Sequence, residues 1–196
     1  REDILYDAKP HVGTDVLLTV VQNLRKRIIS LGGEVRFNTQ VTGLCTENGR
    51  LTGLKIADGT VIPCDRAVLA IGHSARDTFE MLDASGVPME PKPFAMGVRI
   101  EHRQRNIDVA QYGGENPALP PADYKLVEHL DGETVYTFCM CPGGYVVNAS
   151  SEEGGLVVNG MSNADRASGF ANSAIVVSVS EEDFEGDDCL AGVALQ

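Results

Sequence analysis

The sequence contains no tryptophan, few basic residues and no apolar run that could cross a membrane. Its 196 residues include 16 Lys or Arg against 28 Asp or Glu, which gives a formal net charge of -12. Negative charge repels nucleic-acid phosphates and anionic lipid headgroups, and a membrane-spanning helix needs roughly 18 or more consecutive apolar residues. We therefore expect a small-molecule partner and neither a nucleic-acid nor a membrane partner. The oligomeric state is left open.

Two glycine-rich phosphate loops are also missing. The chain has neither Gly-x-Gly-x-x-Gly nor Gly-x-x-x-x-Gly-Lys, the patterns with which backbone N–H groups approach phosphate. No Ser-His-Asp set and no pair of carboxylates stands out either. The sequence therefore gives no support to a hydrolase, and no catalytic residue is predicted from it.

The cysteines are few, odd in number and widely spaced, which does not match a disulfide framework and indicates a reducing compartment, the cytoplasm. They are Cys45, Cys64, Cys139, Cys141 and Cys189. Zinc needs about four ligands and no second pair lies near Cys139 and Cys141, so no metal is expected. We interpret this pair as structural, with a position close to a ligand and a dithiol or metal half-site as the alternatives.

Helix and strand signals follow one another in residues 1–88. Apolar residues at three- and four-residue steps predict a helix over 14–31. Asn48-Gly49 and Asp58-Gly59 are hairpin-turn signals that separate three short strands of an antiparallel meander. A continuous apolar run at 67–71 is typical of a strand buried on both faces of a parallel sheet. The predicted strands are 34–38, 41–46, 51–57, 60–64 and 67–71, and a second helix is predicted at 75–84.

Three prolines between residues 88 and 93 predict a domain boundary there. Beyond it we expect mainly antiparallel strands, at 95–102, 124–130, 134–140, 144–149 and 155–159. The sequence thus predicts an α/β arrangement in the first part and an α+β fold overall. One domain would span 1–88, and a second, incomplete at its C-terminus, would span 89–196.

The order helix, strand, meander, apolar strand and glycine resembles the FAD-binding domain of two-dinucleotide-fold flavoproteins. In that family the chain returns to the sheet through a segment ending in Ala-Thr-Gly or a variant, here Ala70-Ile71-Gly72. The glycine lets the backbone pass close to the cofactor, because it has no Cβ. The resemblance implies FAD contacts at Val41, Ala70, Ile71, Gly72 and His73.

Four further stretches resemble uncharacterised FAD-dependent dehydrogenases, also described as NAD- or FAD-utilising. They are Pro93–His102, Ala122–Leu126, Cys139–Gly144 and Asn159–Ser162. Compared with that family, the chain lacks the N-terminal segment that contains Gly-x-Gly-x-x-Gly. The resemblance therefore implies an internal fragment of such a protein.

Seven residues of the second half are candidates for a substrate pocket. Arg99 could bind an anionic substrate, and the competing interpretation is an exposed ion pair with Glu101 on the same strand face. The Gly143-Gly144 pair indicates a tight turn where backbone could approach a ligand. The candidates are Arg99, Cys139, Cys141, Gly143, Gly144, Asn159 and Arg166.

The resemblance implies an FAD-dependent oxidoreductase that passes electrons or hydride between bound FAD and an unidentified substrate. NAD(P) is an additional candidate cofactor. Because the phosphate loop is missing, we expect the fragment alone neither to retain FAD nor to be active. The alternative is a non-catalytic ligand-binding or interaction module derived from such an enzyme.

Overall fold

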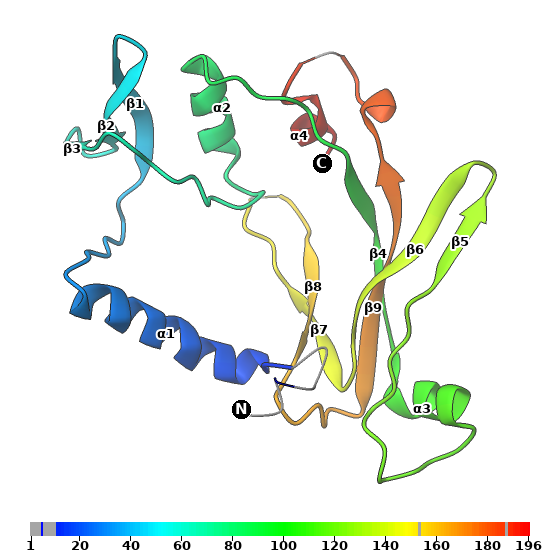
Figure 1. Ribbon diagram of the computed structural model, residues 1–196. Coiled ribbons are helices and arrows are strands. Elements are labelled where there is room, and N and C mark those ends of the chain that lie inside the picture. The colour runs from blue at the N-terminus through cyan, green and yellow to red at the C-terminus, as the bar shows by residue number, and fades with distance from the viewer. Residues whose placement is uncertain (1–4, 6–10, 153, 187) are drawn as a thin grey trace. The chain divides into compact units, whose positions relative to one another are not determined.

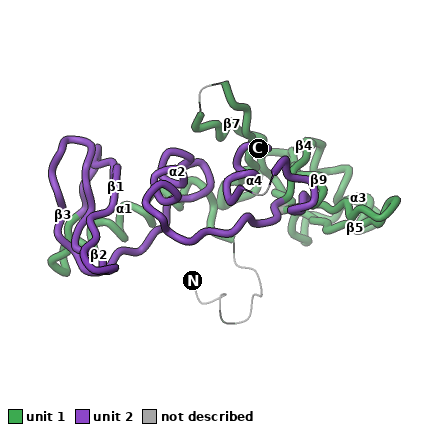
Figure 2. The backbone as a smooth tube through the Cα atoms, turned by 90° about the horizontal axis from the view of Figure 1, so that it is seen from above, with its two compact units in different colours: residues 1–34, 95–178 green, residues 35–94, 179–196 purple. Residues whose placement is uncertain are grey.

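The computed structural model of the chain has an α+β fold with antiparallel sheets (Figure 1). It describes residue 5 and residues 11–196 apart from 153 and 187. The chain divides into two compact units (Figure 2): unit 1 contains residues 1–34 and 95–178, and unit 2 contains residues 35–94 and 179–196. These units do not coincide with the domains 1–88 and 89–196, which stay a prediction.

Unit 1 is built on a four-stranded sheet with the strand order β4-β9-β6-β5. Its strands are β4 (Phe94–Arg103), β5 (Val127–Leu130), β6 (Glu133–Cys141) and β9 (Phe170–Val179). The strand β9 lies between β4 and β6, and its first half is fully buried at Ala171, Asn172 and Ser173. A separate antiparallel hairpin, β7 (Gly144–Asn148) with β8 (Val158–Ser162), continues from the end of β6.

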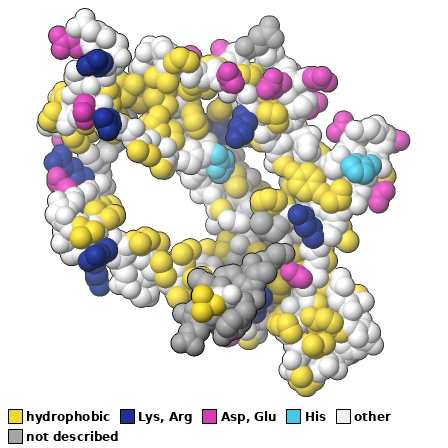
Figure 3. Space-filling model, viewed as in Figure 1, with side chains coloured by type: hydrophobic (Ala, Val, Ile, Leu, Met, Phe, Trp, Pro, Cys, Tyr) yellow, Lys and Arg dark blue, Asp and Glu magenta, His cyan; other side chains and the backbone are white. Residues whose placement is uncertain are grey.

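The first predicted helix is confirmed as α1 (Thr14–Ser30) in unit 1. Its N-terminal end is held by two contacts. The carboxylate of Asp15 accepts a hydrogen bond from the backbone N–H of Ala164 at 3.0 Å, and His11 Nε2 lies 2.9 Å from the carbonyl oxygen of Asn163. No residue of α1 is buried, and Figure 3 shows hydrophobic side chains exposed along it. No helix in the described ranges combines the length and apolar character that a bilayer crossing requires.

The predicted meander is confirmed in unit 2. The strands β1 (Val41–Glu47), β2 (Arg50–Ile56) and β3 (Val61–Pro63) pair antiparallel in the order β1-β2-β3. Asn48 and Gly49 both have positive φ, 50° and 73°, as a type I′ hairpin turn requires. The turn residues therefore set the pairing of β1 with β2.

The second predicted helix is confirmed as α2 (Arg76–Ala84), which buries Leu82. Asp77 Oδ2 of this helix accepts a hydrogen bond from Gln40 Nε2 at 2.6 Å. A side-chain N–H of Arg76 donates to the carbonyl oxygen of Val193. That residue belongs to α4 (Ala191–Leu195), which follows a short 3-10 helix at Glu181–Asp183.

The strands predicted at 34–38 and 67–71 do not form, and both predictions are wrong for this chain. The apolar run is open to solvent, and Val68 is 93% exposed. A strand of a parallel sheet needs neighbouring strands for its backbone hydrogen bonds. Within the part of unit 2 that the structure describes, the only sheet is the meander, so neither segment has a strand to pair with.

Two elements of unit 1 were not predicted. The helix α3 (Gln104–Tyr112) ends at Gly113, whose φ of 74° is the left-handed conformation typical of a residue just after a helix. The strand β9 contains the β-branched run Ile175-Val176-Val177, which is a strand signal that the sequence interpretation did not use.

Candidate functional site

The candidate site lies in unit 1, where Arg99 of β4 meets Asn172 of the adjacent strand β9. Arg99 Nη1 donates a hydrogen bond to Asn172 Oδ1 at 2.7 Å. Arg99 is half-buried, whereas Asn172 exposes none of its surface. No ion pair joins Arg99 to Glu101 within the described structure, and Glu101 Oε2 instead accepts a hydrogen bond from the backbone N–H of Val146 at 3.3 Å. The competing interpretation of Arg99 therefore fails.

Two donor atoms of this pair are buried without an acceptor among the described residues, Arg99 Nε and Asn172 Nδ2. A guanidinium can only donate, so the Asn172 atom that faces it must be Oδ1, and Nδ2 is left as a donor. A buried donor without a partner costs about 1–3 kcal/mol, and more for a charged group. The arrangement is therefore incomplete until an acceptor is present.

Cys141 and Gly160 complete the cluster around Arg99 and Asn172. Cys141 lies at the end of β6 and is the register partner of Asn172. A Cβ added to Gly160 of β8 would overlap Asn172 Oδ1 and Arg99 Nη1 and would come within 2.8 Å of Cys141 Sγ. Only glycine lets the β8 backbone approach these three side chains so closely. We call these four residues the Arg99 cluster.

The predicted glycine turn lies next to this cluster. The backbone N–H of Gly143 donates to the side chain of the buried residue Gln104 at 3.0 Å. A Cβ on Gly143 would overlap the carbonyl oxygen of Arg166, and one on Gly144 would lie 3.1 Å from Cys141 Cβ. The close approach at this turn is therefore made by the protein's own chain.

The remaining pocket candidates are Arg166, Asn159 and Cys139, and none of them belongs to the Arg99 cluster. Arg166 contacts the glycine turn through its backbone, with φ of 52°, and its Nε is buried without an acceptor in the described structure. The side chain of Asn159 is exposed and accepts a hydrogen bond from the backbone N–H of Gly160 at 2.8 Å. Strand alternation thus brings Gly160, and not Asn159, to the cluster. The side chain of Cys139 lies outside the described part of the chain.

The predicted cofactor residues belong to unit 2. Val41 begins β1, and Ala70, Ile71, Gly72 and His73 form an exposed segment without regular structure. Gly72 has φ of 72°, and no atom lies within 4 Å of a Cβ placed on it. A large group could pass this backbone position without steric conflict, so Gly72 fits the contact with FAD that the resemblance implies. Other exposed glycines, such as Gly86 and Gly132, are equally open, so the contact of Gly72 with FAD stays a prediction.

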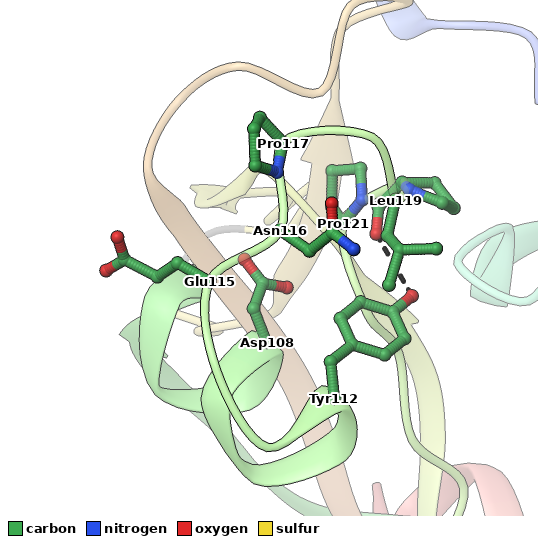
Figure 4. Close-up of a pocket in the computed structure, with 8 residues that line it drawn as sticks. Asp108, Tyr112, Glu115, Asn116, Pro117, Leu119 and Pro121 are labelled. Atoms are coloured by element: carbon green, nitrogen blue, oxygen red, sulfur yellow. Dashed lines mark hydrogen bonds between the residues drawn. The ribbon is translucent and has the colours of Figure 1, made fainter.

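A hollow in unit 1, of about 380 Å³, lies between α3 and the loop that follows it (Figure 4). Its two carboxylates already have partners. Asp108 Oδ1 accepts hydrogen bonds from Gln104 Nε2 and from the backbone N–H of Ala122, both at 2.8 Å, and Glu115 pairs with Arg105. The hollow therefore lacks the unmet hydrogen-bonding groups that distinguish the Arg99 cluster.

Cys189 in unit 2 is the cysteine with the altered acidity. Its thiol lies 3.4 Å from Asp83 Oδ1, and burial together with this carboxylate raises the pKa of Cys189. A raised pKa keeps the sulfur in its less reactive thiol form. Among the described residues, no group of three or more His, Cys, Asp or Glu side chains could hold a metal ion.

Comparison with known proteins shows the class of this chain. Residues 93–196 match the family described as "FAD-dependent protein, C-terminal domain-like", and the chain belongs to that family. It is also 50% identical over 198 residues to an uncharacterized protein of Clostridium beijerinckii. That match covers 99% of this chain and 37% of the relative, so the chain spans little more than a third of the relative's length. Unit 1 of the chain, which holds the Arg99 cluster, lies largely within the matched region.

The sequence interpretation did not choose Gly160 as a site residue, and it placed Asn172 only in a polar segment that could line a pocket or be a surface loop. A signal for Asn172 exists, because a large polar residue stands among small and apolar residues in a strand that reads Phe-Ala-Asn-Ser-Ala-Ile-Val-Val. A buried polar residue in such a strand needs a hydrogen-bond partner. For Gly160 no local signal exists, since its role depends on which side chains lie opposite.

Proposed function

We propose that the intact protein is an FAD-dependent oxidoreductase, a dehydrogenase that passes electrons or hydride between FAD and a small-molecule substrate. Membership of an FAD-dependent family supports the cofactor. The length of the Clostridium relative supports a protein larger than this chain. FAD supplies the redox chemistry when bound, and the residues of this chain would bind, orient and shield the substrate.

The observation that carries the substrate side of this proposal is the Arg99 cluster. A half-buried guanidinium and a buried amide both hold donor atoms without acceptors in the described structure, and a thiol lies beside them. Structural pairs normally satisfy their own donors, whereas binding sites leave them for a ligand. The cluster therefore fits a substrate-binding role better than a purely structural one.

On the cofactor side, we propose that Gly72 admits FAD, with its neighbours Ala70, Ile71 and His73 and the start of β1 at Val41 along the same path. The open space beside Gly72 supports this role. NAD(P) is proposed as the second redox partner and the cytoplasm as the compartment, both on the strength of the sequence interpretation alone.

The test is an anaerobic reduction experiment on the full-length protein. Purified protein is expected to be yellow, with FAD released on denaturation. NADH and NADPH are then added separately while the visible flavin absorbance is followed, and bleaching by one of them is expected. A full-length protein that carries no FAD, or whose FAD is bleached by dithionite but by neither nucleotide, would contradict the nicotinamide dehydrogenase proposal. The first result would also favour the ligand-binding module.

A further inference from the structure

We infer that the Arg99 cluster binds a carboxylate, so that the ligand of unit 1 is a small molecule carrying a carboxylate group. Calling this ligand the substrate rests on the proposed function; the binding site itself does not. The inference is drawn from the charge, the geometry and the unmet hydrogen bonds of Arg99 and Asn172.

Charge is the first argument. A guanidinium stays protonated at every relevant pH, and Arg99 is half-buried with no acidic partner among the described residues. Its only hydrogen bond there goes to the neutral amide of Asn172. An uncompensated charge that is partly removed from water favours an anion as its ligand.

Geometry fits an anion that offers two oxygens side by side, as a carboxylate does. The Nη1 atom of Arg99 is already directed at Asn172, which leaves the edge of the guanidinium that contains Nε. That edge presents parallel N–H groups, whose spacing matches the two oxygens of a carboxylate. Asn172 Nδ2 supplies an additional donor from the adjacent strand. Both Nε and Nδ2 are fully buried, so a carboxylate reaches them only when neighbouring groups move aside. It can then accept all of these hydrogen bonds at once, since each oxygen has two lone pairs.

The surroundings keep the donors in place. Gly160 fits closely against both Arg99 and Asn172, and Asn172 is fully buried. The guanidinium and the amide are therefore oriented before a ligand arrives, which reduces the entropy lost on binding. The β8 backbone lies so close to the cluster that it leaves no room there for a bulky group. We therefore expect the carboxylate to be a terminal group of the ligand.

The experiment compares two probes of the same shape on the full-length protein with FAD bound, benzoate and its neutral amide benzamide. Isothermal titration is expected to show benzoate binding at least about tenfold more tightly, because the charge-assisted hydrogen bonds are absent with the amide. Equal binding of the two probes, or binding of neither, would overturn the inference and indicate that water satisfies the donors.

Variants then assign the preference to the cluster. Arg99→Gln is expected to abolish the preference for benzoate. Asn172→Asp should also abolish it while keeping the fold, because the new carboxylate neutralises the charge of Arg99 and replaces the Nδ2 donor by an acceptor. The matched control is Arg103→Gln, an exposed residue of the same strand that loses the same charge. Retention of the preference in either cluster variant, or its loss in the control, would contradict the inference.

The comparison of benzoate with benzamide can fail or succeed independently of the flavin reduction experiment. If nicotinamide nucleotide bleaches the flavin but benzoate and benzamide bind alike, the carboxylate site is wrong and the dehydrogenase proposal stands. If the probes differ and the difference depends on Arg99, yet neither nucleotide reduces the flavin, the carboxylate site stands and the proposed activity is wrong. The comparison of the two probes on the unmodified protein decides the inference even if Arg99→Gln does not fold.

Discussion

Two glycines of unit 1 and one glycine of unit 2 have different surroundings. In unit 1, other parts of the chain fill the space beside Gly143 and Gly160, namely the carbonyl of Arg166 and the Arg99–Asn172 pair. In unit 2, no atom lies within 4 Å of the Cβ position of Gly72. Side chains that are packed against their neighbours are already oriented before a ligand binds. An exposed backbone position such as Gly72 has no such neighbours, and its contacts form with the ligand itself. If both proposals hold, the Arg99 cluster is organised before its ligand binds, and the contacts of Gly72 form only when FAD binds.

The largest expected effect concerns the affinity for FAD. It tests whether the residues of unit 2 can bind the cofactor tightly without a phosphate loop. The 196-residue chain should bind FAD about a thousandfold more weakly than the full-length protein. A phosphate loop contributes charge-assisted hydrogen bonds of about 1.5–3 kcal/mol each, and the loss of two or three corresponds to that factor. Fluorescence titration of both proteins with FAD measures it. One tightly bound FAD per 196-residue chain would show that the described segments suffice.

The next effect tests the close packing of unit 1. Gly143→Ala should destabilise the fold by about 2–4 kcal/mol, because the new Cβ meets the Arg166 carbonyl and the residue has positive φ. The control is Gly132→Ala, where φ is also positive but no atom lies within 4 Å, and about 1 kcal/mol is expected. Urea unfolding of the three proteins gives both values. Equal losses would mean that the packing at Gly143 is relaxed.

Gly72→Val in the full-length protein should weaken FAD binding by about tenfold, which corresponds to the loss of roughly one good contact. The branched side chain would occupy the space through which the cofactor is proposed to pass. Gly86→Val is the matched control, since Gly86 also has positive φ and open surroundings but lies after α2. A Gly72→Val protein that binds FAD with unchanged affinity would remove the residue-level support for the cofactor path.

A smaller effect concerns Cys189. Because the Asp83 carboxylate helps to raise the pKa of Cys189, Asp83→Asn should lower that pKa and speed alkylation by iodoacetamide several-fold at neutral pH. Mass spectrometry of the modified peptides gives the rate, with Cys64 of the same unit as the internal reference. An unchanged rate at Cys189 would assign the raised pKa to burial and to Asp188 instead of Asp83.

The smallest effect tests the turn between β2 and β3. The hydroxyl and backbone N–H of Thr60 bond Asp58 Oδ1 at 2.7 and 2.9 Å and lower the pKa of Asp58 below its usual 3.8. A carboxylate with a lowered pKa in the folded state stabilises the fold above the usual pKa, and this contribution is lost as pH falls through the lower, folded value. Asp58→Asn should therefore lower the thermal midpoint slightly at about pH 7, and the difference should shrink as the pH falls through the folded pKa of Asp58. A difference that persists in acid would rule out the charge as its cause.

Local signals predicted the parts of the fold that depend on neighbours in sequence. The turn at Asn48-Gly49 and the periodicity of α1 gave correct elements, since both depend on short-range geometry. The strands expected at 34–38 and 67–71 were wrong, because a strand of a parallel sheet is stabilised by strands distant in sequence.

The same distinction holds for the candidate site. The sequence marked Arg99 and Cys141 separately, but only the order β4-β9-β6 brings them to the two sides of Asn172. Strand order is a long-range property, and no local pattern of this sequence determines it. Asn159 does not reach the cluster, because a shift of one position changes the face of a strand and places Gly160 there instead, so the predicted pocket role of Asn159 stays a prediction.

The close fit at Gly160 also affects how this protein can tolerate mutation. A methyl group at position 160 would meet Arg99 and Asn172 at once, so the consequences of substitutions at these three positions are not independent. A larger residue at 160 becomes tolerable only after both Arg99 and Asn172 are shortened, and that exchange would remove the guanidinium and the amide. A mutational scan of pairs should therefore show strong epistasis between strands β4, β8 and β9, where a scan of single residues would show three separately intolerant positions.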